Sequence, residues 1–481
     1  MRARALLIAV LGVVLGCGGG ITVAGGDGGV DAAGDAARAD GPRADGPAAD
    51  AHDAGGADVV AGDGAAVDGA AGDAAGGDAG GRAVDPATLD RKLLMGYQGW
   101  FSCPDDGSQP DRWVHWFRDQ TPSSSSATTD MWPETSELDA DEHCATGFTT
   151  PGGAAAPLYS AFRQKTVVRH FKWMEEHDLD GVWLQRFTVE LGDPAFLALR
   201  DQVAANVRAG AEAHGRVFAL MYDISGQNEA TLVDTVKNDW AHVVDTLQLT
   251  ASPRYLRHAG RPVLAIWGLG FSDRPGTTAQ AAEIIAWLQS GAPEAQRVTL
   301  MGGVPTYWRT LTNDSKTDAG WADVYRSFDI ISPWAVGRYG DVAGANSFRQ
   351  NLIAPDLVEA TAHGVGYVPV VFPGFSWHNL TGNVPNQIPR DGGHFYWRQV
   401  YNAIAAGCTM IYGAMFDEVD EGTAMFKMAP TAATLPTQAS YVPLDVDGYA
   451  LPSDWYLQVA NEAGKMLRGD IALQATMPIT P

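Results

Sequence analysis

The stretch Val217-Phe218-Ala219-Leu220-Met221-Tyr222-Asp223 is an uninterrupted apolar run that ends in a single acid. A run of this length is typical of a buried strand. Before it, Phe196, Leu199, Val203 and Val207 recur at the spacing of one helical face, which predicts a helix. An apolar strand that follows a helix indicates a parallel sheet that is covered on both faces.

The same alternation of helix and strand recurs along most of the chain. Eight units of this kind, spread over roughly 380 residues, predict a (β/α)8 barrel of the TIM type with long loops. A doubly wound open sheet is the main alternative, but no Gly-x-Gly-x-x-Gly follows any of the runs. The predicted strands lie within residues 93–101, 181–187, 217–223, 263–268, 298–303, 329–334, 367–374 and 409–414.

The first 88 residues differ in composition from the rest. Residues 1–17 have a basic start, a short apolar run and the end Val14-Leu15-Gly16-Cys17, which resembles the lipobox of bacterial lipoproteins. We expect lipidation of Cys17, with an ordinary cleaved signal as the alternative. Residues 18–88 are rich in Gly, Ala and Asp and predict a disordered tether. The predicted barrel domain is 89–481, exported to the bacterial cell envelope, at the outer membrane or the cell surface.

Net charge limits the classes of partner that the protein can bind, and the cysteines indicate how they pair. The formal net charge of −24 argues against nucleic acid and anionic membrane surfaces as partners, so contact with a membrane is expected only through the lipid anchor. In an oxidising compartment Cys103 and Cys144 are candidates for a disulfide, and Cys408 is expected to be a buried thiol. No spacing of Cys and His suggests zinc, and we expect neither a metal nor a cofactor.

Four carboxylates lie within residues 417–421, directly after the last apolar run. Acids this close repel one another and raise the pKa of at least one of the group. Phe416 and Val419 frame them, which favours a buried cluster over a solvated turn. Because active sites of such barrels lie at the carboxyl ends of the strands, the cluster and Asp223 are expected to converge.

Aromatic residues and a few polar ones follow the other predicted strands. Aromatic faces beside polar groups suit sugar rings, and cleavage of a glycosidic bond needs two carboxyl groups. We therefore predict a glycoside hydrolase with Asp223, Glu418 and Glu421 as catalytic candidates. The predicted sugar-binding residues are Tyr97, Gln98, Trp100, Arg186, Tyr222, Trp267, Trp308, Trp334, Trp377, His378 and Asp417.

Two other functions remain open on the residues alone. A glycan-binding surface lipoprotein without turnover would use the same barrel and the same aromatic ring. A carbohydrate esterase or lyase would need a metal or a Tyr/Lys base, and none is identified in the sequence. A serine nucleophile is not favoured, because no Gly-x-Ser-x-Gly occurs.

The acidic motif also carries a resemblance to a known family. Residues 416–423, Phe-Asp-Glu-Val-Asp-Glu-Gly-Thr, resemble the pattern Phe-Asn-Glu-Trp-His-Glu-Gly-Thr of glycoside hydrolase family 99, and residues 261–267, 372–375 and 390–397 resemble further segments of it. The chain thus looks like the family 71 and 99 group, in particular its family 99-like branch. The resemblance implies a (β/α)8 barrel that cleaves an α-linked mannan or glucan without a cofactor, and it adds Arg390 to the sugar-binding candidates.

Overall fold

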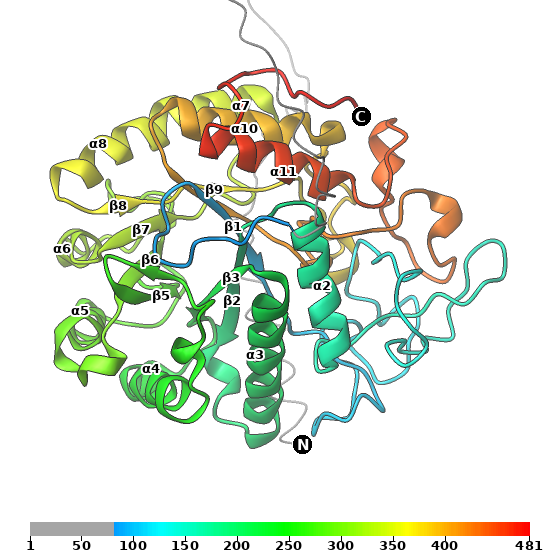
Figure 1. The fold of residues 1–481 in the computed structure, drawn as a ribbon, viewed down its shortest axis with the longest axis horizontal. Coiled ribbons are helices and arrows are strands. Elements are labelled where there is room, and N and C mark those ends of the chain that lie inside the picture. The colour runs from blue at the N-terminus through cyan, green and yellow to red at the C-terminus, as the bar shows by residue number, and fades with distance from the viewer. Residues whose placement is uncertain (1–80) are drawn as a thin grey trace, which may run out of the picture. The chain divides into compact units, whose positions relative to one another are not determined.

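Parallel strands form the wall of the barrel in the computed structural model, which describes residues 81–481 (Figure 1). The strand order is β8-β7-β6-β5-β3-β2-β1-β10-β9. The predicted (β/α)8 barrel is confirmed, whereas the predicted signal peptide, Cys17 and the tether up to residue 80 lie outside the described residues. The strands are β1 (Lys92–Tyr97), β2 (Gly181–Phe187), β3 (Val217–Asp223), β4 (Arg257–His258), β5 (Arg261–Trp267), β6 (Thr299–Val304), β7 (Ile330–Pro333), β8 (Gly366–Tyr367), β9 (Val370–Val371) and β10 (Met410–Gly413).

Eight staves close the cylinder, because β8 and β9 are two halves of one extended segment. β8 pairs with β7, and β9 pairs with β10. Between them, Val368 donates its N–H to the carbonyl of Ile331, and the carbonyl of Pro369 accepts from Tyr412. Proline lacks an N–H and interrupts the regular ladder here. β4 lies outside the ring and forms a two-residue antiparallel hairpin with β5.

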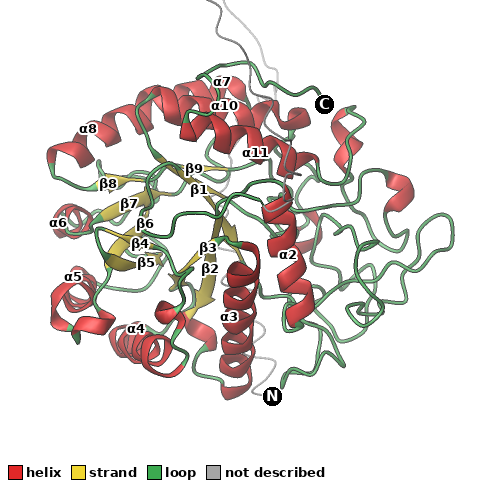
Figure 2. Ribbon diagram, viewed as in Figure 1, coloured by secondary structure: helices red, strands yellow, loops and turns green. Residues whose placement is uncertain are grey.

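Helices surround the strands (Figure 2). Their buried faces follow the predicted periodicity; in α2, for example, Val167, Phe171 and Met174 are buried against the barrel. Asp193 caps α3, since its side chain accepts the N–H groups of Ala195 and Phe196. The helices are α2 (Gln164–Glu176), α3 (Pro194–His214), α4 (Leu232–Ala241), α5 (Thr278–Ala286), α6 (Gly320–Arg326), α7 (Val342–Phe348), α8 (Ala354–Ala362), α9 (His378–Thr381), α10 (His394–Ala405) and α11 (Trp455–Arg468).

The register of the central strands aligns their carboxyl ends. Phe187 at the end of β2 lies opposite Asp223 at the end of β3, and Asp223 in turn lies opposite Trp267 at the end of β5. Every residue of β2 and β3 is buried, as expected for parallel strands covered on both faces. At the start of β2, a Cβ on Gly181 would lie 1.8 Å from the carbonyl oxygen of Val217, so this close approach requires glycine.

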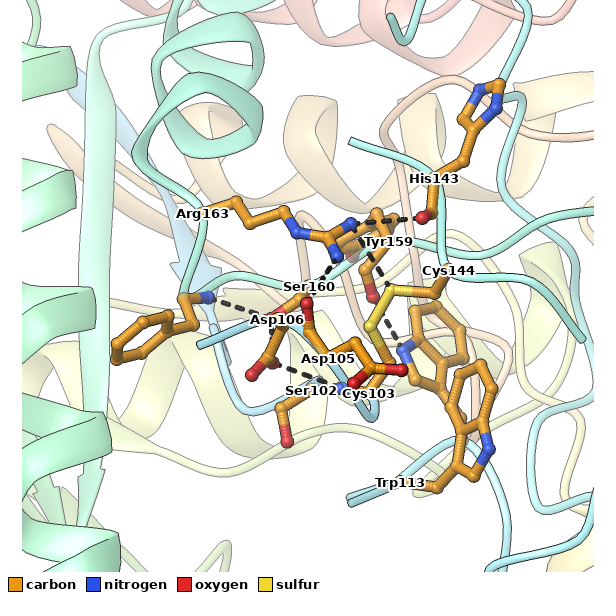
Figure 3. The surroundings of a disulfide bond; sticks show 12 residues. Ser102, Cys103, Asp105, Asp106, Trp113, His143, Cys144, Tyr159, Ser160 and Arg163 are labelled. Atoms are coloured by element: carbon orange, nitrogen blue, oxygen red, sulfur yellow. Dashed lines mark hydrogen bonds between the residues drawn. A yellow bond between two sulfur atoms is a disulfide. The ribbon is translucent and has the colours of Figure 1, made fainter. Parts of the chain in front are cut away.

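A long irregular loop, residues 98–163, joins β1 to α2 and extends to the right of the barrel in Figure 1. Cys103 and Cys144 form a disulfide within it (Figure 3). Arg163, just before α2, donates to the carbonyl of His143 at 3.1 Å and contacts Cys144 Sγ at 3.7 Å. The Asp106 carboxylate accepts from the N–H of Cys103 and the hydroxyl of Ser160. These bonds join distant parts of the loop to one another and to its end just before α2.

Packing against the barrel begins before residue 89, the predicted start of the domain. Arg82 forms ion pairs with Asp178 and Asp180 just before β2, and the N–H of Val84 bonds to the carbonyl of Gly215 just before β3. Val84 is buried. The chain therefore joins the barrel at the amino-terminal ends of its strands. Within residues 81–481, every helix is too short or too polar to cross a bilayer.

Candidate active site

A cavity opens at the carboxyl ends of the strands and holds about 480 Å³ of empty space, open solvent included. Side chains from β1, β2, β3, β5, β7 and β10, or from the loops that follow them, form its wall. This is the end at which active sites of such barrels lie. The lining residues are Gln98, Trp100, Gln185, Phe187, Met221, Asp223, Ser225, Trp267, Trp334, Tyr412, Met415, Glu418 and Glu421.

All three predicted catalytic acids line this cavity. Asp223 ends β3, whereas Glu418 and Glu421 belong to the loop after β10. Two strands along the barrel wall, β2 and β1, lie between β3 and β10, which carries that loop. The acids are nevertheless close enough for the charge of Asp223 to act on both glutamates. Each of the three is less than a tenth exposed. The structure therefore brings together carboxyl groups that are about 200 residues apart in the chain.

Glu418 is held from both sides. Gln98 Nε2 donates to its Oε1 at 2.7 Å, and the hydroxyl of Thr423 donates to its Oε2 at 2.8 Å. Burial raises the pKa of Glu418 to about 7, and the charges of Asp417 and Asp223 act in the same direction. A carboxyl group with a pKa near neutrality can both give and accept a proton at physiological pH.

Asp417, the neighbour of Glu418, turns away from the cavity and joins the acidic loop to the end of β1. Its two carboxylate oxygens accept the N–H groups of Gln98 and Gly99 at 2.7 and 2.9 Å. Burial raises its pKa to about 7, although both hydrogen bonds oppose that shift. Because Gln98 contacts both Asp417 and Glu418, these bonds fix the position of the loop relative to β1.

The rest of the acidic loop is also buried and strongly perturbed. Burial raises the pKa of Glu421 well above its usual value, and the charges of Glu418 and Asp420 raise it further. The pKa of Asp420 is raised in the same way, first by burial and then by Glu418. Asp420 is not among the cavity-lining residues. The raised pKa values expected from the crowded acids are therefore present. Burial is their main physical cause, and repulsion between the acids adds to it.

Asp223 has a hydrogen-bond donor and a positive charge beside it. The N–H of Ser225 donates to its Oδ1 at 2.7 Å, and burial raises the pKa of Asp223 against that hydrogen bond and against the charge of Arg274. Arg274 lies behind the cavity wall, where its Nε donates to the hydroxyl of Ser225 and its guanidinium packs over the ring of Trp267. Its charge lowers the pKa of Glu421 too.

Three predicted sugar-binding tryptophans line the cavity. Trp267 and Trp334 meet edge to face, with ring centroids 5.5 Å apart. Trp100 is stacked between His115, at a centroid distance of 3.9 Å, and Phe187, at 5.2 Å. The indole N–H groups of Trp100, Trp267 and Trp334 are buried and have no partner in the described structure. Indoles of this kind offer both an apolar surface and a hydrogen-bond donor to a sugar.

Arg186 and Tyr222 point away from the cavity into the helical layer. Arg186 donates twice to the Asp239 carboxylate of α4, at 2.7 Å each, and once to Asp201 of α3. The hydroxyl of Tyr222 donates to Asp239 at 2.6 Å. Successive side chains of a strand face opposite sides of the sheet, so the cavity receives their neighbours.

The remaining predicted sugar-binding residues also lie outside the cavity wall. The hydroxyl of Tyr97 contacts His170 of α2, and the indole of Trp308 donates to Asp356 of α8. Arg390 donates to the carbonyls of Gly422 and Ala424 at 2.7 Å each and so supports the acidic loop.

Trp377 directly precedes α9, and His378 begins that helix. The side chain of Trp377 is buried against Phe375, and a ring nitrogen of His378 lies 2.6 Å from the carbonyl of Asn383. The N–H of His378 donates to buried Asp130 of the long first loop. This segment therefore joins two loops at the rim of the barrel.

Six cavity residues were not among the sequence candidates. Two of them, Gln185 and Met221, each directly precede a residue that was chosen. Along β3, alternation from the predicted acid Asp223 identifies Met221, whereas along β2 no candidate marked the face that Gln185 shares with Phe187. The full set is Gln185, Phe187, Met221, Ser225, Tyr412 and Met415.

One group of acids elsewhere has the spacing of a metal site. Asp139, Asp141 and Glu142 are close enough for a shared ion. Lys165 and Arg169 already pair with these carboxylates, at distances between 2.5 and 3.1 Å. Their positive charges occupy the place that an ion would take.

No protein-family model and no curated protein matches the sequence. Among solved structures, the GH99 endo-α-mannosidase of Bacteroides thetaiotaomicron in complex with bis-tris-propane is similar, with a TM-score of 0.56 and 16% identity, over 80% of this chain and 99% of that one. Another structure of that mannosidase gives a TM-score of 0.56 at 15% identity, over 79% and 99% of the two chains. The fold of this chain is therefore similar to that of family 99.

Proposed function

We propose that this protein is a glycoside hydrolase that acts on an α-linked polysaccharide or glycan. The single observation that carries the proposal is the convergence of Asp223, Glu418 and Glu421 on one cavity walled by tryptophans. Hydrolysis of a glycosidic bond needs an acid for the leaving oxygen and a second carboxylate as base or nucleophile. An α-linked mannan or glucan is the proposed substrate class, because residues 416–423 resemble the motif of family 99.

Each acid has a role that its surroundings support. Glu418 or Glu421 acts as the general acid, since burial raises the pKa of both and keeps a proton available near neutral pH. Asp223, on the facing wall, acts as base or nucleophile, because the Ser225 N–H and the charge of Arg274 oppose the rise that burial causes in its pKa. Gln98 orients Glu418 through its 2.7 Å hydrogen bond.

The test is the release of reducing ends from α-mannans and α-glucans by the purified protein. Asp223→Asn, Glu418→Gln and Glu421→Gln each remove one acid with little change in shape, and loss of a catalytic acid typically costs about 10²- to 10⁴-fold in rate. We expect Asp223→Asn and one of the two glutamine variants to fall into that range. Asp234→Asn, at an exposed position on α4, is the matched control and should keep the wild-type rate.

The outcomes separate the functions that the sequence left open. Wild-type rates in all three acid variants would end the proposal. Binding of glycan by the wild-type protein without release of reducing ends would instead support the non-catalytic glycan-binding lipoprotein.

Export and lipid anchoring through Cys17 belong to the same proposal. They are supported by the basic start, the apolar run and the lipobox-like end of residues 1–17. Metabolic labelling with a radioactive fatty acid in a bacterial host tests the anchor. The wild-type chain should incorporate label into the membrane fraction, and Cys17→Ala should not. Equal labelling of both chains would rule out Cys17 as the lipidated residue.

A further inference from the structure

A second groove lies at the opposite end of the barrel from the acidic cavity and holds about 1160 Å³ of empty space, open solvent included. Arg261 and Pro262, at the start of β5, contribute to it, whereas Trp267 at the end of β5 lines the cavity. Six residues of strand place the two sites roughly 20 Å apart. This floor groove is lined by Val244, Asp245, Gln248, Thr250, Ala251, Arg257, Gly260, Arg261, Pro262, Glu294, Ala295 and Arg297.

Three arginines line the floor groove. Arg257 and Arg261 lie on the two strands of the β4–β5 hairpin, and Arg297 precedes β6. Each side chain donates to a main-chain carbonyl, to Thr250 at 3.2 Å, to Gln289 at 2.9 Å and to Ala292 at 2.9 Å respectively. One hydrogen bond of this kind holds a guanidinium in place and leaves several of its five N–H donors for a ligand.

These guanidiniums have no ionic partner among residues 81–481. Arg257 and Arg297 are half-buried and Arg261 is exposed, whereas the fully buried arginines Arg186 and Arg200 pair with Asp239 and Glu190. Within the described chain, Arg257, Arg261 and Arg297 form no ion pair with a carboxylate. Three arginines line one groove without a carboxylate partner in the described chain. Positive charges placed in this way favour an anionic ligand.

Two acids border the floor groove and limit its charge. Asp245 accepts a hydrogen bond of 2.7 Å from the side-chain amide of Gln296, and Glu294 is exposed. They leave one net positive charge in the groove, in a chain with a formal net charge of −24. Attraction over long distances is therefore weak, and binding depends on direct contacts between guanidinium and anion.

We propose that the floor groove binds a soluble ligand that carries two or more phosphate groups. The planar fork of arginine matches the oxygens of a phosphate in a bidentate contact. The arginines come from two segments, the β4–β5 hairpin and the residues before β6, so a ligand with two phosphates can contact both segments better than a ligand with one.

The experiment is calorimetric titration of the full chain with inorganic pyrophosphate and, separately, with orthophosphate. We expect pyrophosphate to bind more tightly than orthophosphate. Arg257→Gln and Arg297→Gln should each weaken pyrophosphate binding about tenfold, and the double variant about 100-fold. Glu294→Gln removes a negative charge from the rim and should strengthen binding. Arg349→Gln is the matched control, because Arg349 also donates to a main-chain carbonyl, that of Ala405.

Several results would overturn the site. They are no pyrophosphate binding by the wild-type chain, equal binding of the two anions, unchanged binding in the double variant, or an equal loss in Arg349→Gln. If the double variant fails to fold, the test is the affinity of Glu294→Gln for pyrophosphate. An affinity equal to that of the wild-type chain counts against the proposal. The readout is binding at the barrel floor and does not depend on turnover in the acidic cavity, so failure of one proposal leaves the other intact.

Discussion

The imidazole of His115 lies flat on the indole of Trp100, with ring centroids 3.9 Å apart and planes inclined by 8°. Phe187 covers the other face of the indole at 5.2 Å. Trp100 and Phe187 line the cavity, and His115 does not. Burial lowers the pKa of His115 well below its usual value, so the ring in this stack is neutral. His115 is therefore a positioning residue for Trp100.

Replacing His115 tests that role. His115→Leu removes the stacked ring, and the loss of an aromatic pair worth about 0.5–1.5 kcal/mol frees Trp100 to move. We expect kcat/KM to fall by up to about tenfold. His115→Phe keeps a flat ring and should restore most of the rate, although the cost to folding is similar in both variants, since residue 115 has a positive φ of 62°. Equal rates in the two variants would contradict a role for stacking.

The buried acids make stability depend on pH in a defined direction. Folding raises the pKa of Glu418 from 4.5 to about 7, so between these values the folded chain holds a proton that the unfolded chain has released. The stabilisation is complete below about pH 4.5 and is lost as the pH rises through about 7. Denaturant unfolding at several pH values should show a smaller loss over this window for Glu418→Gln than for the wild type. If the unfolding free energy of the two chains changes equally with pH, the result contradicts a raised pKa of Glu418.

The ion pair between Arg186 and Asp239 should dominate the stability of the layer between β2 and α4. Asp239→Ala leaves the guanidinium of Arg186 and the hydroxyl of Tyr222 without their shared acceptor. Removing one partner of a buried pair typically costs about 3–5 kcal/mol of unfolding free energy. Asp234→Ala, exposed on the same helix, should change it by less than about 0.5 kcal/mol. Urea unfolding checks both values, and similar losses in the two variants would contradict the assignment.

The Cys103–Cys144 disulfide should stabilise the long first loop. It joins residues that are 41 apart in the chain, and a cross-link of this kind typically contributes about 2–4 kcal/mol. The double variant Cys103→Ser, Cys144→Ser should unfold at lower urea and lose its sensitivity to reductant. Cys408→Ser, which removes the buried free thiol, should keep that sensitivity. A reductant effect that persists in the double variant would contradict the assignment.

The strand pattern was sufficient to predict the barrel. Each predicted run overlaps an observed stave, and β2 and β3 coincide with the predicted ranges at both ends. The reason is physical: a parallel strand buried on both faces is apolar throughout and stands out from its helical neighbours. Closure of the ring at β8 and β9 was less visible, because Pro369 interrupts the hydrogen-bond ladder there.

The face of each strand was harder to read from the sequence. Because every residue of β2 is buried, no contrast between an apolar and a polar face shows whether Arg186 or Gln185 faces the interior of the barrel. The partner that decides it is Asp239 on α4, about 50 residues later, and its pairing with Arg186 is a tertiary contact. Trp308 is similar, since its acceptor Asp356 lies on α8. The acids at 418 and 421 were easier, because their motif itself combines charge with apolar neighbours.

The entry of the chain along the barrel floor has a consequence for access. Arg82 and Val84 fasten the polypeptide beside the starts of β2 and β3, and the acidic cavity opens at the far ends of the same strands. The segment that carries Arg82 and Val84 therefore lies at the barrel floor, opposite the tryptophan-walled opening. A bulky ligand that approaches this opening therefore does not meet the segment that carries Arg82 and Val84.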